Sequence, residues 1–519
     1  MKKKIYINDK IEEKIINYIP IRYILAILLA VIETSLVISI VVFLTIFIPY
    51  FFIAIIITEL FVIVEISISD ENPDFKIPWL IVVVFLPIIG FMVYFLFSKR
   101  KLKRKFIKKI NKLNGIKYNN ESELNLMNLK KIDLSAYNSA NLLCKIAGTN
   151  LFNKNSIEYF SFGENYFERL LIDLKQAQKF IYMEYFIIED GLFWSEIFNV
   201  LKEKAQRGLD VKILYDDIGC MTKLPGDYAR QLKKYGIKCA IFSKLKGNAD
   251  SEFNNRNHRK ITIIDGIIGY TGGINIADEY INEIKKFGKW KDIGIRIKGD
   301  SVYELTKLFM IDFGINSKEK WDNYNLFFPK VEIKQNNEYV IPFGDGPKPI
   351  YKYYVGKVII QNLIENAKKY VYITTPYLII DNELCMTLEN AALRGVKVKV
   401  IVPHIPDKKV IFQMTKGFYA RLIQSGVEIY EYTPGFIHAK CYLADDKYCI
   451  LGTINLDYRS LVHHFENGVW LYNCQVILNI KEDLEATLLE SELIKIENVK
   501  TNIFKRIFNI FVKLFAPML

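Results

Sequence analysis

The sequence predicts an α/β protein built from two homologous halves that follow a membrane-spanning N-terminal region. Three observations lead to this prediction. The first hundred residues contain three long apolar runs, which are typical of helices that cross a bilayer. The rest of the chain alternates short apolar strands with helical segments, as α/β sheets do. One pattern of polar residues occurs twice, 180 residues apart, which indicates a duplicated unit.

The N-terminal region divides into a basic tail, residues 1–22, and a membrane region, residues 23–98. The expected transmembrane helices are the apolar runs at about 24–48, 50–68 and 78–97, of which two or three cross the membrane. A cleavable signal peptide is excluded, because it would be shorter and would end at a small-residue cleavage site.

Positive charge lies on both sides of the membrane region. A basic juxtamembrane linker, residues 99–150, begins with the run Lys99–Lys105 and continues with Lys108 and Lys109. The positive-inside rule keeps this run, and everything after it, in the cytosol. The basic N-terminal tail favours an even number of crossings, whereas three runs are visible, so the number of crossings in residues 23–68 stays open.

The two halves are predicted at residues 151–330 and 331–500, because strand and helix signals follow in the same order in both. In the first half the strand-like Phe180–Ile188 precedes a helix that ends at Gly208 and the strand Val211–Tyr215. In the second half the corresponding segments are Lys369–Thr374, a helix that ends at Gly395, and Val396–Val402. This order predicts two α/β sandwich halves with largely parallel sheets.

The repeated pattern is built on two of the five histidines in the chain. In each copy Lys follows His at +2, Asp at +7, Gly at +14 and Asn at +17. The first copy consists of His258, Lys260, Asp265, Gly272 and Asn275, and the second of His438, Lys440, Asp445, Gly452 and Asn455. Repetition of a rare residue in an unchanged register predicts one active site assembled from both halves.

These residue types suit phosphoryl transfer. His and Lys two positions apart on an extended segment project to one face, since side chains alternate along a strand. Two such segments would surround an anion with two imidazoles and two ammonium groups, and Asn275 and Asn455 would add donors for phosphate oxygens. One imidazole attacks phosphorus and the other protonates the leaving alcohol. Asp265 and Asp445 belong to the catalytic set or mainly brace their loops.

A later acid also repeats, two residues before a glycine in each half. Asp292 and Glu466 are the candidates to bond the far nitrogen of a histidine and fix its tautomer. The scheme needs no metal and no cofactor, and the sequence contains no metal-ligand cluster. The seven cysteines are scattered without a CxxC pair, which excludes a disulfide framework.

The last segment, residues 501–519, is predicted to be an amphipathic helix. Its apolar residues fall on one helical face, with basic residues largely opposite, as in helices that lie on an anionic membrane surface. Docking on the protein's own core is the alternative. The net charge of +13 fits an anionic membrane as the partner, because the densest charge adjoins the membrane region.

The sequence resembles the phospholipase D superfamily in its two His-x-Lys-x4-Asp motifs, and within it the bacterial cardiolipin synthases from about Pro73 onward. The longer matching strings are Asn255–Ile261, Thr271–Asn275, Trp290–Asp292, Gly452–Ser460, Glu184–Phe186 and Thr375–Tyr377. The resemblance implies that the substrate is phosphatidylglycerol, and the apolar runs and basic flanks predict a multi-pass protein of the cell membrane whose catalytic domain is cytosolic. The resemblance also implies transfer of a phosphatidyl group to a second phosphatidylglycerol, with His258 as nucleophile and His438 as general acid and base.

Other functions use the same residues. A phospholipase D hydrolase differs only in that water resolves the intermediate, and a related transferase uses another alcohol. A membrane-tethered nuclease or nucleic-acid-binding protein is disfavoured, since the basic run is juxtamembrane and not spread over the halves. We therefore expect no nucleic acid partner, and the oligomeric state is left open.

Overall fold

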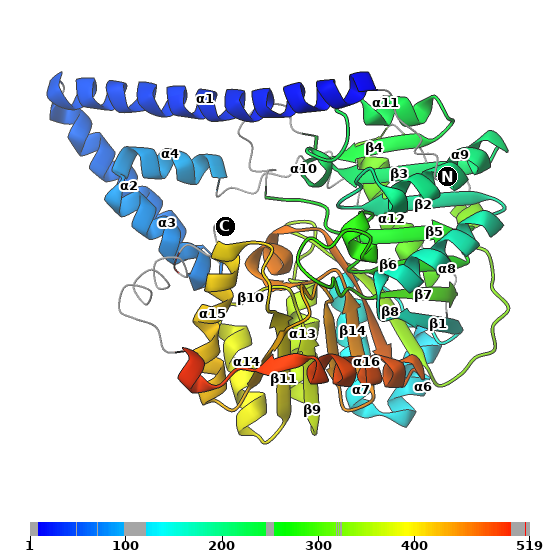
Figure 1. The fold of residues 1–519 in the computed structure, drawn as a ribbon. Helices are drawn as coiled ribbons and strands as arrows, with labels where there is room; N and C mark the ends of the chain where they lie inside the picture. Colours follow the sequence, from blue (N-terminus) through cyan, green and yellow to red (C-terminus); the bar gives the residue numbers. More distant parts are fainter. Residues whose placement is uncertain are drawn as a thin grey trace.

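The computed structural model describes residues 9–47, 49–69, 71–97, 121–244, 254–317, 319, 321, 324–499 and 514. Within these residues the chain forms two large mixed sheets, one in each half, and a group of N-terminal helices (Figure 1). The basic run that begins at Lys99, the tail up to residue 8 and nearly all of the expected C-terminal helix 501–519 lie outside the described residues.

The sheet of the first half has seven strands in the order β1-β7-β6-β5-β2-β3-β4. Strands β2, β3 and β4 are parallel, whereas β5, β6, β7 and β1 continue the sheet in antiparallel pairs. Their bounds are β1 Asn155–Phe160, β2 Phe180–Tyr185, β3 Asp210–Asp216, β4 Lys238–Phe242, β5 Lys260–Ile264, β6 Ile268–Gly272 and β7 Gly294–Gly299.

The sheet of the second half repeats this arrangement as β8-β16-β14-β13-β9-β11-β12, with β17 added at the end. The pairing directions correspond strand by strand to those of the first half. Their bounds are β8 Tyr339–Asp345, β9 Tyr370–Thr374, β11 Lys397–Pro403, β12 Glu428–Tyr432, β13 Cys441–Ala444, β14 Tyr448–Gly452, β16 Glu466–Tyr472 and β17 Ser491–Leu493. The duplication predicted from the sequence is therefore present in the fold.

Each half contributes a helix that packs against both sheets. Helix α12 (Val302–Asn316) of the first half packs against β8, and α16 (Val476–Leu489) of the second half packs against β1. Both helices belong to one apolar core that takes residues from both sheets, including Tyr182 and Val340. This shared core explains why α12 is buried almost all round, and it holds the two halves as one body.

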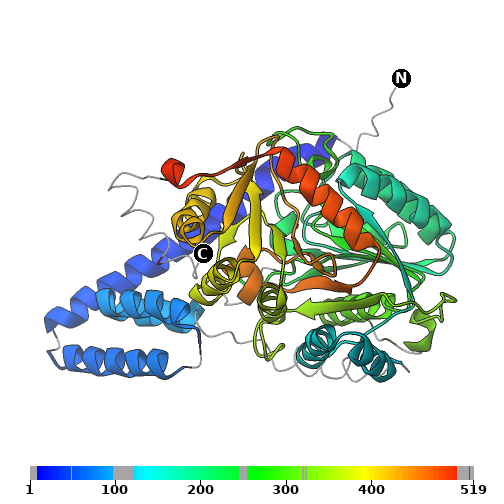
Figure 2. The ribbon, with the colours of Figure 1, turned by 90° about the horizontal axis from the view of Figure 1, so that it is seen from below.

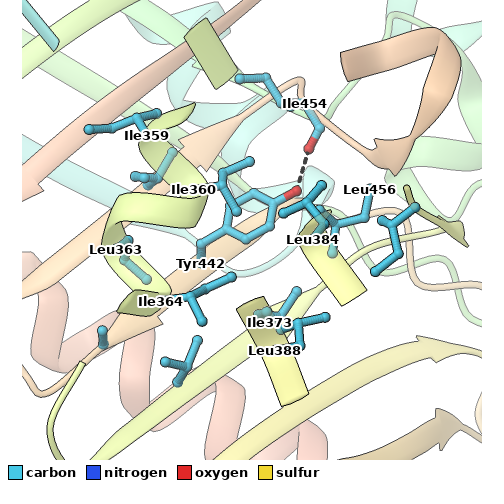
Figure 3. Close-up of a cluster of buried hydrophobic side chains, with 14 of the residues drawn as sticks. Ile359, Ile360, Leu363, Ile364, Ile373, Leu384, Leu388, Tyr442, Ile454 and Leu456 are labelled. Carbon is cyan, nitrogen blue, oxygen red and sulfur yellow. Dashed lines mark hydrogen bonds between the residues drawn. The ribbon is translucent and has the colours of Figure 1, made fainter. Parts of the chain in front are cut away.

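Further helices cover the outer face of each sheet. On the first half these are α8 (Gly163–Gln176) and α9 (Leu192–Gln206), and short helices α10 (Asp217–Cys220) and α11 (Tyr228–Lys233) follow β3. On the second half they are α13 (Val355–Asn366), α14 (Asn382–Leu393) and α15 (Lys409–Gln424). Figure 3 shows the second outer core, where Tyr442 lies among leucine and isoleucine side chains and donates to the carbonyl oxygen of Ile454 at 2.9 Å.

Part of the stretch expected to be a linker is structured. Residues 122–147 form α6 (Ser122–Ile132) and α7 (Leu134–Ala147), and Leu129 and Leu143 join the core of the second half. Asp133 begins α7 by accepting from the backbone N–H of Ala136 and also accepts from the hydroxyl of Tyr472. The apolar spacing in this polar segment is helical, so it gains stability only by packing on the folded domain.

The N-terminal helices lie at one side of the two halves, and the first and longest of them extends from there across the halves, as both views show (Figures 1 and 2). They are α1 (Asp9–Phe47), α2 (Pro49–Ile68), α3 (Pro73–Phe85) and α4 (Pro87–Phe97). Among the described residues one segment, Ile24–Phe43 of α1, is long and apolar enough to cross a membrane by length and composition. The apolar run 78–97, expected as one span, is divided at Pro87 into α3 and α4, because proline cannot continue the helical hydrogen bonds.

Candidate active site

The two histidines occupy equivalent places, each just before the start of a central strand in its own sheet. His258 precedes β5, and its N–H donates to the carbonyl oxygen of Phe465 at 2.8 Å. His438 precedes β13, and its N–H donates to the carbonyl oxygen of Lys291 at 2.7 Å. The acceptor in each case belongs to the opposite half. The backbone around each histidine is therefore fixed by the association of the two halves.

The repeated acids bind the histidines crosswise. Nδ1 of His258 lies 3.0 Å from both carboxylate oxygens of Glu466, and Nδ1 of His438 lies 2.6 Å from Oδ2 of Asp292. Both acids are fully buried. An ionised carboxylate only accepts, so each Nδ1 carries the proton and each Nε2 keeps its lone pair. The acids therefore lie at the far nitrogens of the histidines, where the sequence placed them as candidates.

The two carboxylates have different surroundings. Glu466 also accepts from the hydroxyls of Thr453 and Ser460, the latter at 2.6 Å. At the position equivalent to Thr453 the first half has Gly273, where an added Cβ would lie 2.1 Å from Oδ1 of Asp292. Asp292 accepts from the backbone N–H of Ile293 at 2.8 Å. Because Asp292 accepts from fewer other donors than Glu466, its negative charge interacts more strongly with His438.

Burial and charge set the ionisation of the pairs. Burial by itself would raise the pKa of Glu466. The opposing effect of His258 is larger, so the pKa of this carboxyl lies well below its usual range. Lys440 and His438 likewise overcome the effect of burial and lower the pKa of Asp292. Burial lowers the pKa of His258 well below its usual value, and burial together with Lys440 lowers that of His438 to about 4. Both imidazoles are neutral at pH 7 in the free protein.

The two lysines lie behind the histidines. Nζ of Lys260 donates to the carbonyl oxygen of His258 at 2.7 Å, and Nζ of Lys440 makes the same bond to His438. Both lysines are completely buried, while each histidine keeps 7% of its surface exposed. Burial, reinforced by the charge of Lys440, lowers the pKa of Lys260 to about 7, and burial lowers that of Lys440 to about 8. A bound anion would restore the charge on both.

Aromatic rings hold the imidazoles in place. The ring centroid of Phe186 lies 5.2 Å from that of His258, and Tyr280, Trp290 and Phe436 surround His438 at 5.4 to 5.9 Å. These contacts limit access of water and explain the low basicity of the histidines.

The two asparagines of the pattern are used differently. Asn275 accepts from the N–H of Ile187 at 3.1 Å and donates to the hydroxyl of Tyr280 at 2.7 Å, so it supports the ring beside His438. Oδ1 of Asn455 is buried with no hydrogen-bond partner among the described residues. Since the two ends of an amide are interchangeable by rotation, Asn455 is the better candidate for contact with a substrate.

The structure does not bring Asp265 and Asp445 to the histidines. Asp265 follows the far end of β5 and accepts from the backbone N–H groups of Gln178, Lys179 and Phe180 at 2.7 to 2.9 Å. Asp445 follows β13 and makes the same three bonds to residues 368–370. Each brace fixes the start of the neighbouring antiparallel strand, β2 or β9, which is the structural alternative that the sequence left open. Gly272 and Gly452 of the pattern are also structural, because a Cβ there would lie 2.3 and 2.4 Å from a backbone oxygen.

Sequence reasoning assigned no role to several buried groups near the site. Arg256 binds the fully buried carboxylate of Asp216 through Nε and Nη2, and Asp216 also accepts from the N–H of Asn257. Arg259 donates to Asp312 of its own half and to the carbonyl oxygens of Glu466 and Asp345 in the other. The signal was the string Asn255–Ile261, in which arginines flank the histidine.

One group in the described part of the chain has the composition of a metal site, namely His258, His464 and Glu466, whose ligand-type atoms lie within 4.8 Å of one another. The hydrogen bonds from His258, Thr453 and Ser460 already occupy both oxygens of Glu466. Nδ1 of His464 lies 3.5 Å from Oε1 of the same carboxylate. Glu466 and His258 are accounted for by these hydrogen bonds, whereas both ring nitrogens of His464 are buried with no hydrogen-bond partner among the described residues.

Two α/β halves that share one site, each supplying a histidine, a lysine and the carboxylate for the other half's histidine, define a phosphoryl-transfer enzyme of the phospholipase D type. The chain belongs to the family described as "Cardiolipin synthase, PLD-like domain", whose model matches residues 170–305 and 360–488. Residues 51–99 match a second family, described as "Phospholipase_D-nuclease N-terminal".

Relatives and a solved structure agree with this assignment. A Streptococcus mutans protein described as uncharacterized is 39% identical over 447 residues, which cover 85% of this chain and 96% of that protein. A cardiolipin synthase of Staphylococcus aureus is 32% identical and covers 90% of this chain and 96% of its own length. The crystal structure of a phosphatidylserine synthase from Haemophilus influenzae has a TM-score of 0.56 at 16% identity, over 73% of this chain and 98% of that one. It shares the fold.

Proposed function

We propose that the protein is a cardiolipin synthase that transfers the phosphatidyl group of one phosphatidylglycerol to the hydroxyl of another and releases glycerol. The observation that carries the proposal is the crosswise pairing of two buried histidines with Glu466 and Asp292. It presents two imidazole Nε2 atoms in one site, one for each of the two tasks that a displacement at phosphorus needs. Similarity to named cardiolipin synthases over most of the chain supports the choice of substrate.

In the first step, Nε2 of His258 attacks phosphorus, and the bond from phosphorus to the glycerol oxygen breaks. His438, protonated once the anionic phosphodiester is bound, gives its proton to the departing oxygen, so glycerol leaves neutral. The resulting positive charge on His258 is balanced by Glu466. Asp292, which has fewer other donors, stabilises the imidazolium form of His438, and this difference supports the assignment of acid and nucleophile.

In the second step, neutral His438 removes the proton from a hydroxyl of the second phosphatidylglycerol. The alkoxide oxygen attacks phosphorus and the bond between phosphorus and His258 breaks, which restores both histidines. Lys260 and Lys440 supply positive charge beside the phosphoryl oxygens, and Asn455 is the candidate amide donor to them. No metal or other cofactor takes part in this scheme.

The proposed setting is the cell membrane, with more than one crossing and the catalytic halves on the cytosolic side. The apolar helices α1 and α2, with exposed side chains along most of their length, support membrane association. The basic run in the sequence after Phe97 supports the cytosolic side and contact with anionic lipid. Nucleic acid is not part of the proposal.

The test is to incubate purified full-length protein with phosphatidylglycerol vesicles and to separate the lipid products. The proposal expects cardiolipin and glycerol in equal amounts, and loss of both in His258→Ala and His438→Ala. Phosphatidate in place of cardiolipin would make the protein a hydrolase, and a product only with another added alcohol would make it a different transferase. Radiolabelled phosphatidyl groups bound through an acid-labile bond in wild type and absent in His258→Ala would identify the nucleophile.

A further inference from the structure

Helices α3 and α4 fold back on each other at Leu86 and Pro87. The ring centroids of Trp79 and Tyr94 are 5.5 Å apart, although 15 residues of straight helix would separate them by about 22 Å. Gly90 permits the close return, because a Cβ there would lie 2.4 Å from the carbonyl oxygen of Val82. We call α3 and α4 the N-terminal hairpin.

The beginning of the hairpin is fixed to the second half of the catalytic domain. Phe75 is 8% exposed and belongs to the apolar core of that half. Asn72 donates to Asp381 at 3.1 Å, and the hydroxyl of Tyr458 donates to Asp74 at 2.9 Å. These contacts lie beyond the end of α2 and place this segment on the same side of any membrane as the catalytic domain.

The end of the hairpin leads back to the same side. The described chain resumes at residue 121 and enters α6 and α7, which pack on the second half. If α3 and α4 together crossed the bilayer once, Asn72 and Phe75 would lie on the side opposite to the domain that they contact. Both ends of α3 and α4 therefore lie on one side.

The dimensions and side chains of the hairpin fit entry into one leaflet. Residues 76–85 of α3 reach about 15 Å, half of a hydrocarbon core of about 30 Å. The turn is apolar and open, with Phe85 77% exposed and Leu86 50% exposed. Trp79 and Tyr94 lie nearer the base, where aromatic residues mark the membrane interface, and Nζ of Lys76 bonds the carbonyl oxygen of Ser67 there.

Beyond its fixed beginning, the hairpin packs on the last turns of α2. Val62 and Ile66 of α2 form a small core with Val83 and Tyr94. The earlier part of α2 and residues 24–43 of α1 leave their apolar side chains mostly exposed. In both views α1 leads away from the catalytic halves and α2 returns to them.

We infer that the N-terminal hairpin is a re-entrant element in the leaflet next to the catalytic domain, and that within residues 9–97 only α1 and α2 cross the bilayer. This topology has an even number of crossings and keeps the basic tail and the basic run on one side, as the positive-inside rule requires. It reconciles three apolar runs with two basic flanks.

The hairpin also reaches the active site. The ring of Phe75 contacts that of His463 at 5.7 Å, in the short π-helix η4 (Arg459–His463). The next residue, His464, lies beside Glu466 and His258. The hairpin thus seats the edge of the site at the surface of the leaflet, where a phospholipid headgroup enters it.

The test uses single added cysteines in the full-length protein in sealed membrane vesicles of both orientations, with a membrane-impermeant maleimide. Suitable positions are Ser69 before the hairpin, Phe85 at its turn, Tyr50 between α1 and α2, and Leu489 as a marker of the catalytic domain. The seven native cysteines all lie in residues 144–474, so the unsubstituted protein gives the background. The inference expects Ser69→Cys to label from the same side as Leu489→Cys, and Tyr50→Cys from the other side. Phe85→Cys is expected to react only with a membrane-permeant maleimide.

Each contrary result overturns the inference. Labelling of Ser69→Cys from the Tyr50 side would mean that α3 and α4 cross, and labelling of Phe85→Cys by the impermeant reagent would place the turn in water. Recovery of the protein in the soluble fraction would show that it is not a membrane protein. Limited proteolysis shows whether each variant is folded. Because labelling needs no turnover, failure of the proposed synthase activity would leave this result unaffected.

Discussion

Asp292 lies 2.6 Å from Nδ1 of His438, although the two residues are 146 positions apart and belong to different halves. Glu466 and His258 form the reciprocal pair across 208 positions. Neither half alone supplies the carboxylate that bonds its own motif histidine, His258 or His438. The site is complete only where the halves meet, because each half supplies the carboxylate for the histidine of the other.

Glu466→Gln and Asp292→Asn should each lower kcat on the order of 10²- to 10⁴-fold, because a neutral amide neither fixes the Nδ1–H tautomer nor stabilises the imidazolium. KM should change little. The check is steady-state kinetics over a range of pH, where loss of the carboxylate should also shift the pH profile. Asp265→Asn, in the same half as Asp292 but far from the histidines, is the matched control. An equal loss of kcat in the control would contradict the assignment.

Asp265→Ala should act on stability. It removes the acceptor of three backbone N–H groups and should lower the free energy of unfolding by about 2–4 kcal/mol, while the folded fraction keeps its kcat. Asp445→Ala should cost less, since Asp445 is only partly buried and its bonds to Lys368 and Lys369 are exposed to water, whereas Asp265 and its equivalent bonds are more buried. Denaturant titration monitored by tryptophan fluorescence measures both. A large loss of kcat with unchanged stability would restore these aspartates to the catalytic set.

Phosphate affinity should fall as pH rises through about 7 to 8. In the free protein Lys260 has a pKa of about 7 and Lys440 of about 8. An anion favours the protonated amines, so binding takes up protons and weakens once both are neutral. Calorimetry with inorganic phosphate in buffers of different ionisation enthalpy measures this uptake. Affinity independent of pH from 6.5 to 9 would show that the lysines do not sense the anion.

Asn455→Ala should raise KM for phosphatidylglycerol several-fold, with a small effect on stability, since its Oδ1 has no partner among the described residues. Asn275→Ala should instead destabilise the protein by about 1–2 kcal/mol, because both ends of its amide are bonded. Kinetics and denaturation of the two variants are compared. Identical behaviour would mean that the two halves use their asparagines alike.

Arg259→Met should destabilise the protein by about 3–5 kcal/mol, because it leaves Asp312 buried without its cation and removes bonds to both halves. Unfolding measurements test this, with Arg169→Met, whose side chain is a third exposed, as control. A value below about 1 kcal/mol would show that the halves do not depend on this arginine.

Much of the fold and of the candidate site could be predicted from interactions between residues that are close together in the sequence. The alternation of apolar strands and helices predicted the two sheets, and the unchanged register of His, Lys, Gly and Asn predicted the duplication. The repeated register and the chemical type together made the histidines and the two acids the candidates, because few side chains can attack phosphorus or orient an imidazole. These features depend on residues near one another in the chain, where strand and helix periodicity holds.

Only the tertiary structure decided the rest. The exchange of Asp292 and Glu466 between the halves depends on how two sheets pack, which periodicity does not encode. Asp265 is a brace because strand β5 separates it from His258 and because strand β2, which starts 80 residues before β5, begins beside it. The attachment of the N-terminal hairpin to the catalytic domain depends on contacts of Asn72 and Phe75 with residues more than 300 positions away. Hydropathy indicates that a segment is buried away from water. Which segment it packs against depends on contacts between distant parts of the chain.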